Sequence, residues 1–178
     1  MTIHYLKKGK TAEDKAIDDA QVSELVKNTL SLIEEKGDEA VRAFSEKFDN
    51  YSPKSYKLSA AEIDNLIAAV SERDMEDINF AQEQVRKFAQ AQRDSMQDIE
   101  VETMPGVILG HKNIPVQSVG CYVPAGKFPM VASAHMSVVT ASVAKVPRII
   151  ACTPPYQGEP NAAVIAAMHL GGAHEMYV

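Results

Sequence analysis

Residues 119–135 are VGCYVPAGKFPMVASAH, and they contain the passage from a strand to a helix on which the expected fold depends. The β-branched and aromatic residues up to Val123 favour a strand. The run of small residues that begins at Ser133 favours a helix. Between them, Pro124, Gly126 and Pro129 favour a loop. The sequence therefore predicts a strand, a loop and a crossover helix in this order.

Two more strands and one more helix are expected after this stretch. The strands are predicted over 116–123, 148–153 and 174–178, and the helices over 133–145 and 161–170, with Gly171-Gly172 ending the second helix. Strands that alternate with helices of this length indicate a parallel sheet with right-handed crossovers. We therefore expect an α/β protein with a partial doubly wound, Rossmann-like sheet.

The N-terminal half has a helical pattern from about Asp18 to Ser95. A first helix is predicted up to a left-handed C-cap at Gly37, and a second short helix follows it. Ser59 and Glu62 have the spacing of a capping box at the start of a third helix. The apolar stripe of the first helix is formed by Val22, Leu25, Val26, Thr29 and Ile33, and that of the third by Ile63, Leu66, Ile67 and Val70.

A long fourth helix is predicted from about Met75 to Met96. Its inward face is expected to carry Ile78, Ala81, Val85 and Phe88, while its Gln, Arg and Glu side chains point to solvent. This charged face is interpreted as an ordinary solvated surface.

The pattern changes to short β-rich runs after Asp98. Ile99–Met104 and Val107–Ile114 flank Pro105-Gly106 and predict a β-hairpin. We therefore divide the chain into a helical region, 1–97, and an incomplete dinucleotide-binding region, 98–178. Three strands with two crossover helices would leave one edge and some apolar surface uncovered, so a truncated chain is expected.

Composition narrows the possible classes of protein. The 178 residues carry a net charge of −6, with 46% hydrophobic and 24% charged residues, as in an ordinary globular protein. Its basic residues are dispersed, which argues against nucleic-acid binding. No run of residues is long and apolar enough for a membrane helix. The N-terminus lacks the pattern of a secretory signal, so a cytoplasmic location is expected.

The loop resembles phosphate-binding motifs without matching them. A P-loop needs a Ser or Thr after Gly-Lys, but Phe128 follows Gly126-Lys127, and the first glycine, Gly120, lies one position too far away. The Gly-x-Gly-x-x-Gly fingerprint is also absent, because only Gly120 and Gly126 are present here. The position of the loop, at the carboxyl end of a strand and before a helix, still favours ligand binding.

Tyr122 is the strongest candidate for a ligand contact. Its ring offers a flat apolar face and its hydroxyl one hydrogen bond, although a core tyrosine would show the same pattern. Cys121 and Cys152 are expected to be buried free thiols. The histidines are scattered without zinc spacing, and no metal ligand set is predicted within the chain.

Three stretches together resemble the N-terminal part of the histidinol dehydrogenase family: Gly37-Asp38 to Lys47-Phe48-Asp49, then Val119-Gly-Cys-Tyr-Val-Pro-Ala-Gly126, then Ile150-Ala-Cys-Thr-Pro-Pro155. The resemblance implies an NAD-dependent, zinc-containing dehydrogenase. Such an enzyme oxidises a primary alcohol through an aldehyde to a carboxylate and works as a homodimer. The family's zinc ligands and catalytic Glu-His pair lie beyond the matched segment, so the resemblance places no catalytic or metal residue in this chain.

The resemblance assigns Tyr122 to NAD contact, with Pro124 and Gly126 shaping the loop. Ala125 stands where members that make histidine usually have glycine. The stretches MTIHYLKK and PAGKFPM are similar to the branch that oxidises sulfopropanediol. The chain alone is expected to be inactive. Two other interpretations stay open: a small self-contained α/β protein that binds a nucleotide or partner, and a fragment completed by a separately encoded piece.

Overall fold

The computed structural model describes residues 9–178, so the MTIHYLKK stretch lies outside the described residues. The contacts within the chain group it into two units, one ending at Ser52 and the other running from Pro53 to Val178.

The first unit consists of two helices that pack on each other, α1 (Ala12–Lys36) and α2 (Asp38–Asp49). A capping box between Thr11 and Asp14 begins α1. Gly37 ends it as predicted, and its N–H donates to the Ile33 carbonyl at 2.8 Å. Its φ is positive, at 56°, but its ψ is −133°, so the cap is not left-handed helical as expected. No residue of α1 is buried.

The second unit begins with α3 (Ala60–Ala68) and α4 (Glu72–Asp94). The predicted capping box is confirmed: the Ser59 hydroxyl accepts from the Glu62 N–H, and the Glu62 carboxylate accepts from the Ser59 N–H. The expected stripe of α3 is half-buried, and this helix packs against α7 (Ala162–Gly171).

The inward face predicted for α4 is partly wrong. Ile78 is buried and Val85 is half-buried, as expected, but Phe88 is exposed and Ala89 is buried in its place. Gln82, which was expected to face solvent, is also buried. Positions 78, 82, 85 and 89 follow the three-and-four spacing of one helix face, whereas position 88 lies a full 100° from position 89.

The predicted hairpin is confirmed. Strands β1 (Ile99–Met104) and β2 (Val107–His111) pair antiparallel. Gly106 occupies the turn with φ 82°, a conformation that glycine adopts without steric cost. The Gly106 N–H donates to a carboxylate oxygen of Glu102 at 2.8 Å, which fastens the turn to β1.

A three-stranded parallel sheet follows, in the order β3 (Ser118–Tyr122), β4 (Arg148–Cys152) and β5 (Glu175–Tyr177). The first crossover consists of α5 (Val131–Ala134), a π-helical turn η1 (His135–Val139) and α6 (Thr140–Val143). The second is α7, which begins after an Asn161 cap and ends at Gly172 with φ 109°. The predicted β-α-β-α-β order is thus confirmed.

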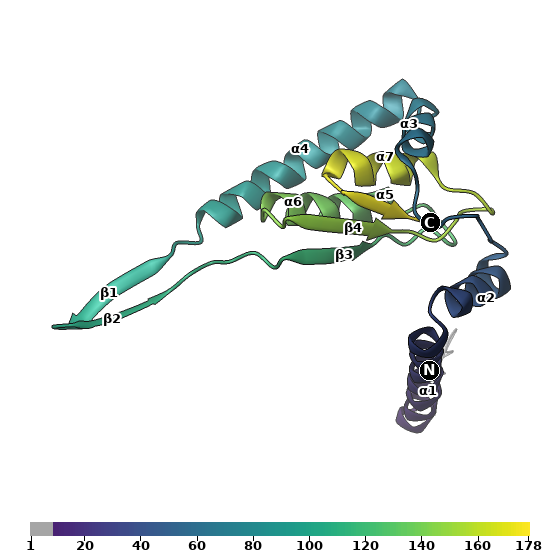
Figure 1. The fold of residues 1–178 in the computed structure, drawn as a ribbon, viewed down its shortest axis with the longest axis horizontal. Helices are drawn as coiled ribbons and strands as arrows, with labels where there is room; N and C mark the ends of the chain where they lie inside the picture. The colour runs from purple at the N-terminus through teal and green to yellow at the C-terminus, as the bar shows by residue number, and fades with distance from the viewer. Residues whose placement is uncertain (1–8) are drawn as a thin grey trace, which may run out of the picture. The chain divides into compact units, whose positions relative to one another are not determined.

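The helices of this unit lie against one face of the sheet (Figure 1). Cys121, Ala151 and Met176 occupy neighbouring register positions on the helix-covered face, and all three are buried. Helices α5, η1, α6 and α7 pack in a layer next to the sheet, and α3 and α4 pack on that layer. The strands therefore alternate between a buried and an uncovered side instead of being apolar on both.

The uncovered side is called the open face. It carries Tyr122, Cys152 and Tyr177 in one row across the three strands, and Gly120, Ile150 and Glu175 in the next. Side chains alternate along a strand, so these residues point away from the helices. The expected uncovered surface is thus present among the described residues.

One sheet edge is less exposed than expected. Residues 56–58 run antiparallel to β5: the Leu58 N–H donates to the Met176 carbonyl at 3.0 Å, and the Val178 N–H donates to the Tyr56 carbonyl at 2.9 Å. The outer edge of β3 pairs with no strand of the described chain.

The boundary between the two contact-defined units lies between Ser52 and Pro53, whereas the sequence pattern changes between residues 97 and 98. The contacts group α3 and α4 with the sheet. The reason is packing, because α3 rests on α7 while α4 crosses α6, η1 and α7.

Candidate functional site

The loop after β3 extends the carboxyl edge of the sheet. The Val123 N–H donates to the Cys152 carbonyl at 2.8 Å, which continues the pairing with β4 past the end of the strand. The Met130 N–H donates to the Pro124 carbonyl at 3.1 Å and closes the loop. Ala125 is buried, whereas Gly126 is exposed. The loop is therefore anchored at its base and accessible at its tip.

Tyr122 presents its ring on the open face at this edge. The residue is 62% exposed, so it is not the core tyrosine that the alternative interpretation required. Pro124 is half-buried two positions further along the chain. The structure thus places Tyr122, Pro124 and Gly126 in one continuous segment at the carboxyl end of β3, where open α/β sheets bind ligands.

The two glycines of this stretch leave free space. A Cβ atom placed on Gly120 or Gly126 would meet no atom of the described chain within 4 Å. Glycine inside a strand weakens it and often marks a close approach by a ligand or another backbone. Gly120 lies on the same strand side as Tyr122, so the surface beside the ring is low and accessible.

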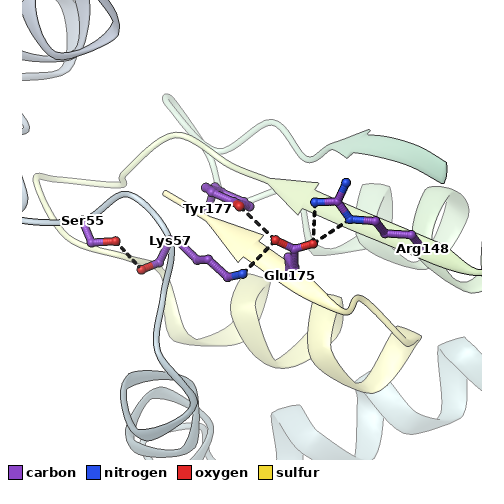
Figure 2. Close-up of polar contacts among 5 residues, drawn as sticks. All are labelled: Ser55, Lys57, Arg148, Glu175 and Tyr177. Atoms are coloured by element: carbon purple, nitrogen blue, oxygen red, sulfur yellow. Dashed lines mark hydrogen bonds and ion pairs between the residues drawn. The ribbon is translucent and has the colours of Figure 1, made fainter. Parts of the chain in front are cut away.

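A charged cluster that sequence analysis missed lies on the open face (Figure 2). The Glu175 carboxylate accepts from Lys57 Nζ at 2.8 Å, from Arg148 Nε at 2.8 Å and from the Tyr177 hydroxyl at 3.0 Å. The hydrogen bonds from Lys57, Arg148 and Tyr177 lower the pKa of Glu175 to about 2. The cluster joins β4, β5 and the segment that covers the edge of β5.

We expect this cluster to make stability sensitive to acid. The folded-state pKa of Glu175 lies below its ordinary value of 4.5, so its contribution is complete above pH 4.5 and is lost as the pH falls towards 2. Glu175→Gln should therefore flatten the decline in unfolding free energy over this interval, as measured by urea denaturation at a series of pH values. Glu159→Gln removes an exposed carboxylate that makes no ion pair in the described chain and is the matched control. If both variants showed the same dependence of unfolding free energy on pH, Glu175 would not be the source of the acid sensitivity.

A second feature that sequence analysis missed is a buried polar contact between α4 and the first crossover helix. Gln82 Nε2 donates to the Ala167 carbonyl at 2.8 Å and lies 3.3 Å from Nδ1 of His135. Burial lowers the pKa of His135, so the folded chain favours the neutral ring. His135 begins the π-helical turn of the crossover helix, and Gln82 therefore links this helix and α7 to α4. Gln82 lies four residues after Ile78 and three before Val85, and this spacing could have predicted that it shares their buried helix face.

The two cysteines are free thiols, as predicted. Cys121 is buried, but Cys152 is exposed, because it lies on the uncovered side of the sheet. Burial raises the pKa of Cys121, and partial desolvation raises that of Cys152, so both favour the protonated form.

Among residues 9–178, no three His, Cys, Asp or Glu side chains are grouped as a zinc site requires. In the same part of the chain, no helix is both long and apolar enough to cross a membrane.

These features define the class of protein: an α/β chain whose parallel sheet offers an exposed tyrosine and a glycine-containing loop at its carboxyl edge. The family follows from comparison, since the histidinol dehydrogenase family model matches residues 12–178. The chain belongs to the histidinol dehydrogenase family. Members of this family are oxidoreductases, so the chain is part of an oxidoreductase family.

Individual relatives agree with this placement. The chain is 52% identical over 174 residues to a histidinol dehydrogenase homolog of Shouchella clausii, an alignment that covers 98% of this chain and 41% of that protein. It is 44% identical to the sulfopropanediol 3-dehydrogenase of Ruegeria pomeroyi over 97% of this chain and 39% of that protein. The chain therefore spans about two fifths of the length of these curated relatives.

A solved structure shares the fold. The crystal structure of histidinol dehydrogenase from Elizabethkingia anophelis superposes with a TM-score of 0.79 at 25% sequence identity, over 97% of this chain and 37% of that one. The two chains thus share one fold over nearly the whole of the present chain.

Proposed function

We propose that this chain forms the dinucleotide-contacting part of an NAD-dependent, zinc-containing dehydrogenase. The whole protein would oxidise a primary alcohol through an aldehyde to a carboxylate, and the 178 residues alone would be inactive. The observation that carries the proposal is the exposed ring of Tyr122 at the carboxyl edge of the sheet, in a chain that belongs to the histidinol dehydrogenase family. A cytoplasmic, homodimeric whole protein is part of the same proposal.

The site fits a dinucleotide in shape and chemistry. Tyr122 offers a flat apolar face for a ribose or ring, and the absence of side chains at Gly120 and Gly126 allows that group to approach the backbone. Pro124 would hold the loop in position. NAD, once bound, supplies the acceptor for the hydride that the alcohol loses. The chain would contribute binding and orientation.

Zinc does not fit the residues described here, because they contain no grouped ligand set. The zinc of the proposed enzyme would therefore be held by residues outside this chain.

We propose a sulfonated diol such as sulfopropanediol as the substrate, in preference to histidinol. The chain is 44% identical over 174 residues to a sulfopropanediol 3-dehydrogenase and 37% identical over 156 residues to a histidinol dehydrogenase. Ala125, in the position where glycine is usual among members that make histidine, supports the same choice. Parallel assays of a family-length protein with both alcohols test this preference, and faster turnover of histidinol would reverse it.

The cofactor site is tested through Tyr122 in a family-length protein. Tyr122→Ala should raise the KM for NAD about tenfold, since an aromatic contact contributes about 1 kcal/mol or somewhat more. Tyr122→Phe should keep most of the affinity, because the ring remains. Phe80→Ala removes an equally exposed aromatic ring from α4 and is the control. An unchanged KM for NAD in Tyr122→Ala would exclude this ring as a cofactor contact.

The alternative, a self-contained nucleotide- or partner-binding protein, makes a different prediction. Calorimetry with NAD on the 178-residue chain should then show saturable binding by a monomer, and a family-length version should oxidise neither alcohol. The edge of β3, which pairs with no strand of the described chain, favours the first proposal, because a free edge is a site for further pairing.

A further inference from the structure

The loop at residues 123–130 is held at one end by the sheet and at the other by the crossover helix. At the first end, the Val123 N–H donates to the Cys152 carbonyl at 2.8 Å. At the second end, the Met130 N–H closes the loop by donating to the Pro124 carbonyl, and α5 follows directly. The position of the loop therefore depends on what holds the start of the crossover helix.

The crossover helix changes its geometry one turn after the loop. His135–Val139 form the π-helical turn η1, in which backbone hydrogen bonds reach the fifth residue instead of the fourth. Two hydroxyl groups add hydrogen bonds here, from Ser137 to the Ser133 carbonyl at 2.7 Å and from Thr140 to the Met136 carbonyl at 2.6 Å. Such a turn rotates the residues before it relative to those after it. A directional contact at its first residue can therefore set the orientation of α5 and the loop.

Gln82 supplies this contact. Its Nε2 group donates to the Ala167 carbonyl at 2.8 Å and lies 3.3 Å from Nδ1 of His135. A carbonyl oxygen only accepts hydrogen bonds, so the amide turns its NH2 group, and not its oxygen, towards Ala167. The second hydrogen of this NH2 group is then available to His135, whose Nδ1 accepts it. The neutral ring consequently carries its own proton on Nε2.

Protonation of His135 would break this contact. A charged imidazole carries a proton on both nitrogens, so its Nδ1–H would face the NH2 group of Gln82, donor against donor. Turning the amide over would place its oxygen against the Ala167 carbonyl, acceptor against acceptor. Gln82 is 4% exposed and His135 is 6% exposed, so water cannot readily replace either partner. The contact therefore requires the neutral ring.

The surroundings of His135 do not favour its charged form. The titratable groups on the elements packed against η1 are Cys121 and Tyr122 on β3, His169 on α7 and, within one turn of Gln82 on α4, Glu83 and Arg86. Cys121 is buried and uncharged, because burial raises its pKa, and the other four residues are exposed. The stretch 131–144 contains no Asp, Glu, Lys or Arg.

Burial lowers the pKa of His135, and no charged group of the described chain adds to this shift. The contact is therefore complete above pH 6.5, the ordinary pKa of histidine, and is lost as the pH falls through the lowered value.

We propose that Gln82 and His135 are positioning residues for the loop at 123–130, and that protonation of His135 releases this loop. The neutral ring holds the start of η1 against α4 and α7, and with it α5 and the loop beside Tyr122. Charging the ring separates it from Gln82 and frees the start of the helix. The inference rests on the proposed function in one respect, because NAD is taken as the ligand of the loop.

Hydrogen–deuterium exchange of the 178-residue chain tests this coupling. The reporter is the Met130 amide, because its hydrogen bond closes the loop. Its protection factor, which is corrected for the intrinsic effect of pH on exchange, should fall about tenfold between about pH 8 and about pH 5, the usual effect of one lost hydrogen bond. The Leu58 amide, which donates to the Met176 carbonyl at the other edge of the sheet, should change by less than about threefold.

Three variants separate positioning from a general loss of stability. Gln82→Met keeps most of the volume but removes the contact, so Met130 protection should already be about tenfold lower at about pH 8 and should depend little on pH. His135→Asn keeps an acceptor near the position of Nδ1 but does not titrate, so protection should stay high at both pH values. Gln84→Ala changes an exposed glutamine of α4 and should behave as wild type.

Three results would overturn the proposal. The first is wild-type protection of Met130 that does not change with pH. The second is an equal loss at Met130 and Leu58, which would indicate general unfolding. The third is a pH response that persists in His135→Asn, because another group would then be its source.

The KM for NAD of a family-length protein provides a second measurement. Gln82→Met should raise this KM by about threefold or more while kcat stays within about twofold, as expected when binding alone is weakened. An unchanged KM in Gln82→Met, where Tyr122→Ala raises it, would overturn the positioning role and leave the dinucleotide proposal standing. The expected loss of Met130 protection, without any effect of Tyr122→Ala on the KM, would exclude the tyrosine contact and leave the coupling standing.

Discussion

Ile149→Ala should lower the free energy of unfolding by about 2–5 kcal/mol, the range found when a buried isoleucine is truncated to alanine. Ile149 lies in the central strand of the sheet, is 1% exposed and faces the helical layer. Truncation would remove three carbon atoms from a close-packed interior and leave a cavity. Urea denaturation of the chain measures the change.

The next residue supplies the control. Ile150 has the same side chain and strand, but it lies on the open face and is half-buried. Ile150→Ala should therefore lower the free energy of unfolding by less than about half as much as Ile149→Ala, because water already contacts part of the Ile150 side chain. Similar costs at the two positions would show that the open face is covered in solution, by a second copy or another element.

The second large effect is expected at Gln82. Gln82→Ala should destabilise the chain by about 2–3 kcal/mol, through the lost hydrogen bond to Ala167, the unpaired Nδ1 of His135 and the space left behind. Gln82 is 4% exposed, so water cannot readily replace the amide. Denaturant unfolding followed by circular dichroism provides the measurement.

Two further variants separate these causes. Gln82→Met keeps most of the side-chain volume but removes the hydrogen bonds. It should therefore lower the free energy of unfolding, but by less than Gln82→Ala does. Gln84→Ala changes an exposed glutamine on the same helix and should stay within about 0.5 kcal/mol of wild type. A full-sized effect at Gln84, or none at Gln82, would be inconsistent with a buried polar link between α4, the crossover helix and α7.

The parallel sheet is covered by helices on one face only. Helices cover the face that carries Ile149, whereas Tyr122 and the Glu175 cluster lie on the open face. A parallel sheet is normally covered on both faces. The open face is thus available to a cofactor or to another part of a family-length protein.

Local signals predicted most of the secondary structure. The Ser59 capping box, the Pro105-Gly106 hairpin and the Gly172 helix end each depend on residues within a few positions of one another. The alternation of strands and helices then predicted the parallel sheet, because short right-handed crossovers allow few other arrangements. Tyr122 was also placed correctly at the end of β3.

Helix facing was predicted less well. Phe88 was assigned to the core because it is large and apolar, and Gln82 to solvent because it is polar. The structure reverses both, since the direction of a side chain follows from its angular position on the helix. A polar side chain is accepted inside once it finds partners, as Gln82 does at Ala167 and His135.

The sequence by itself determined which segments become helices and strands, their order and the position of the loop that carries Tyr122, because those properties arise from neighbouring residues. The tertiary structure alone decided that Lys57 meets Glu175 across 118 positions, that residues 56–58 cover the edge of β5, and that one face of the sheet stays open. Such contacts depend on how whole elements pack, and no local pattern of residue types encodes the distance between segments so far apart in the chain.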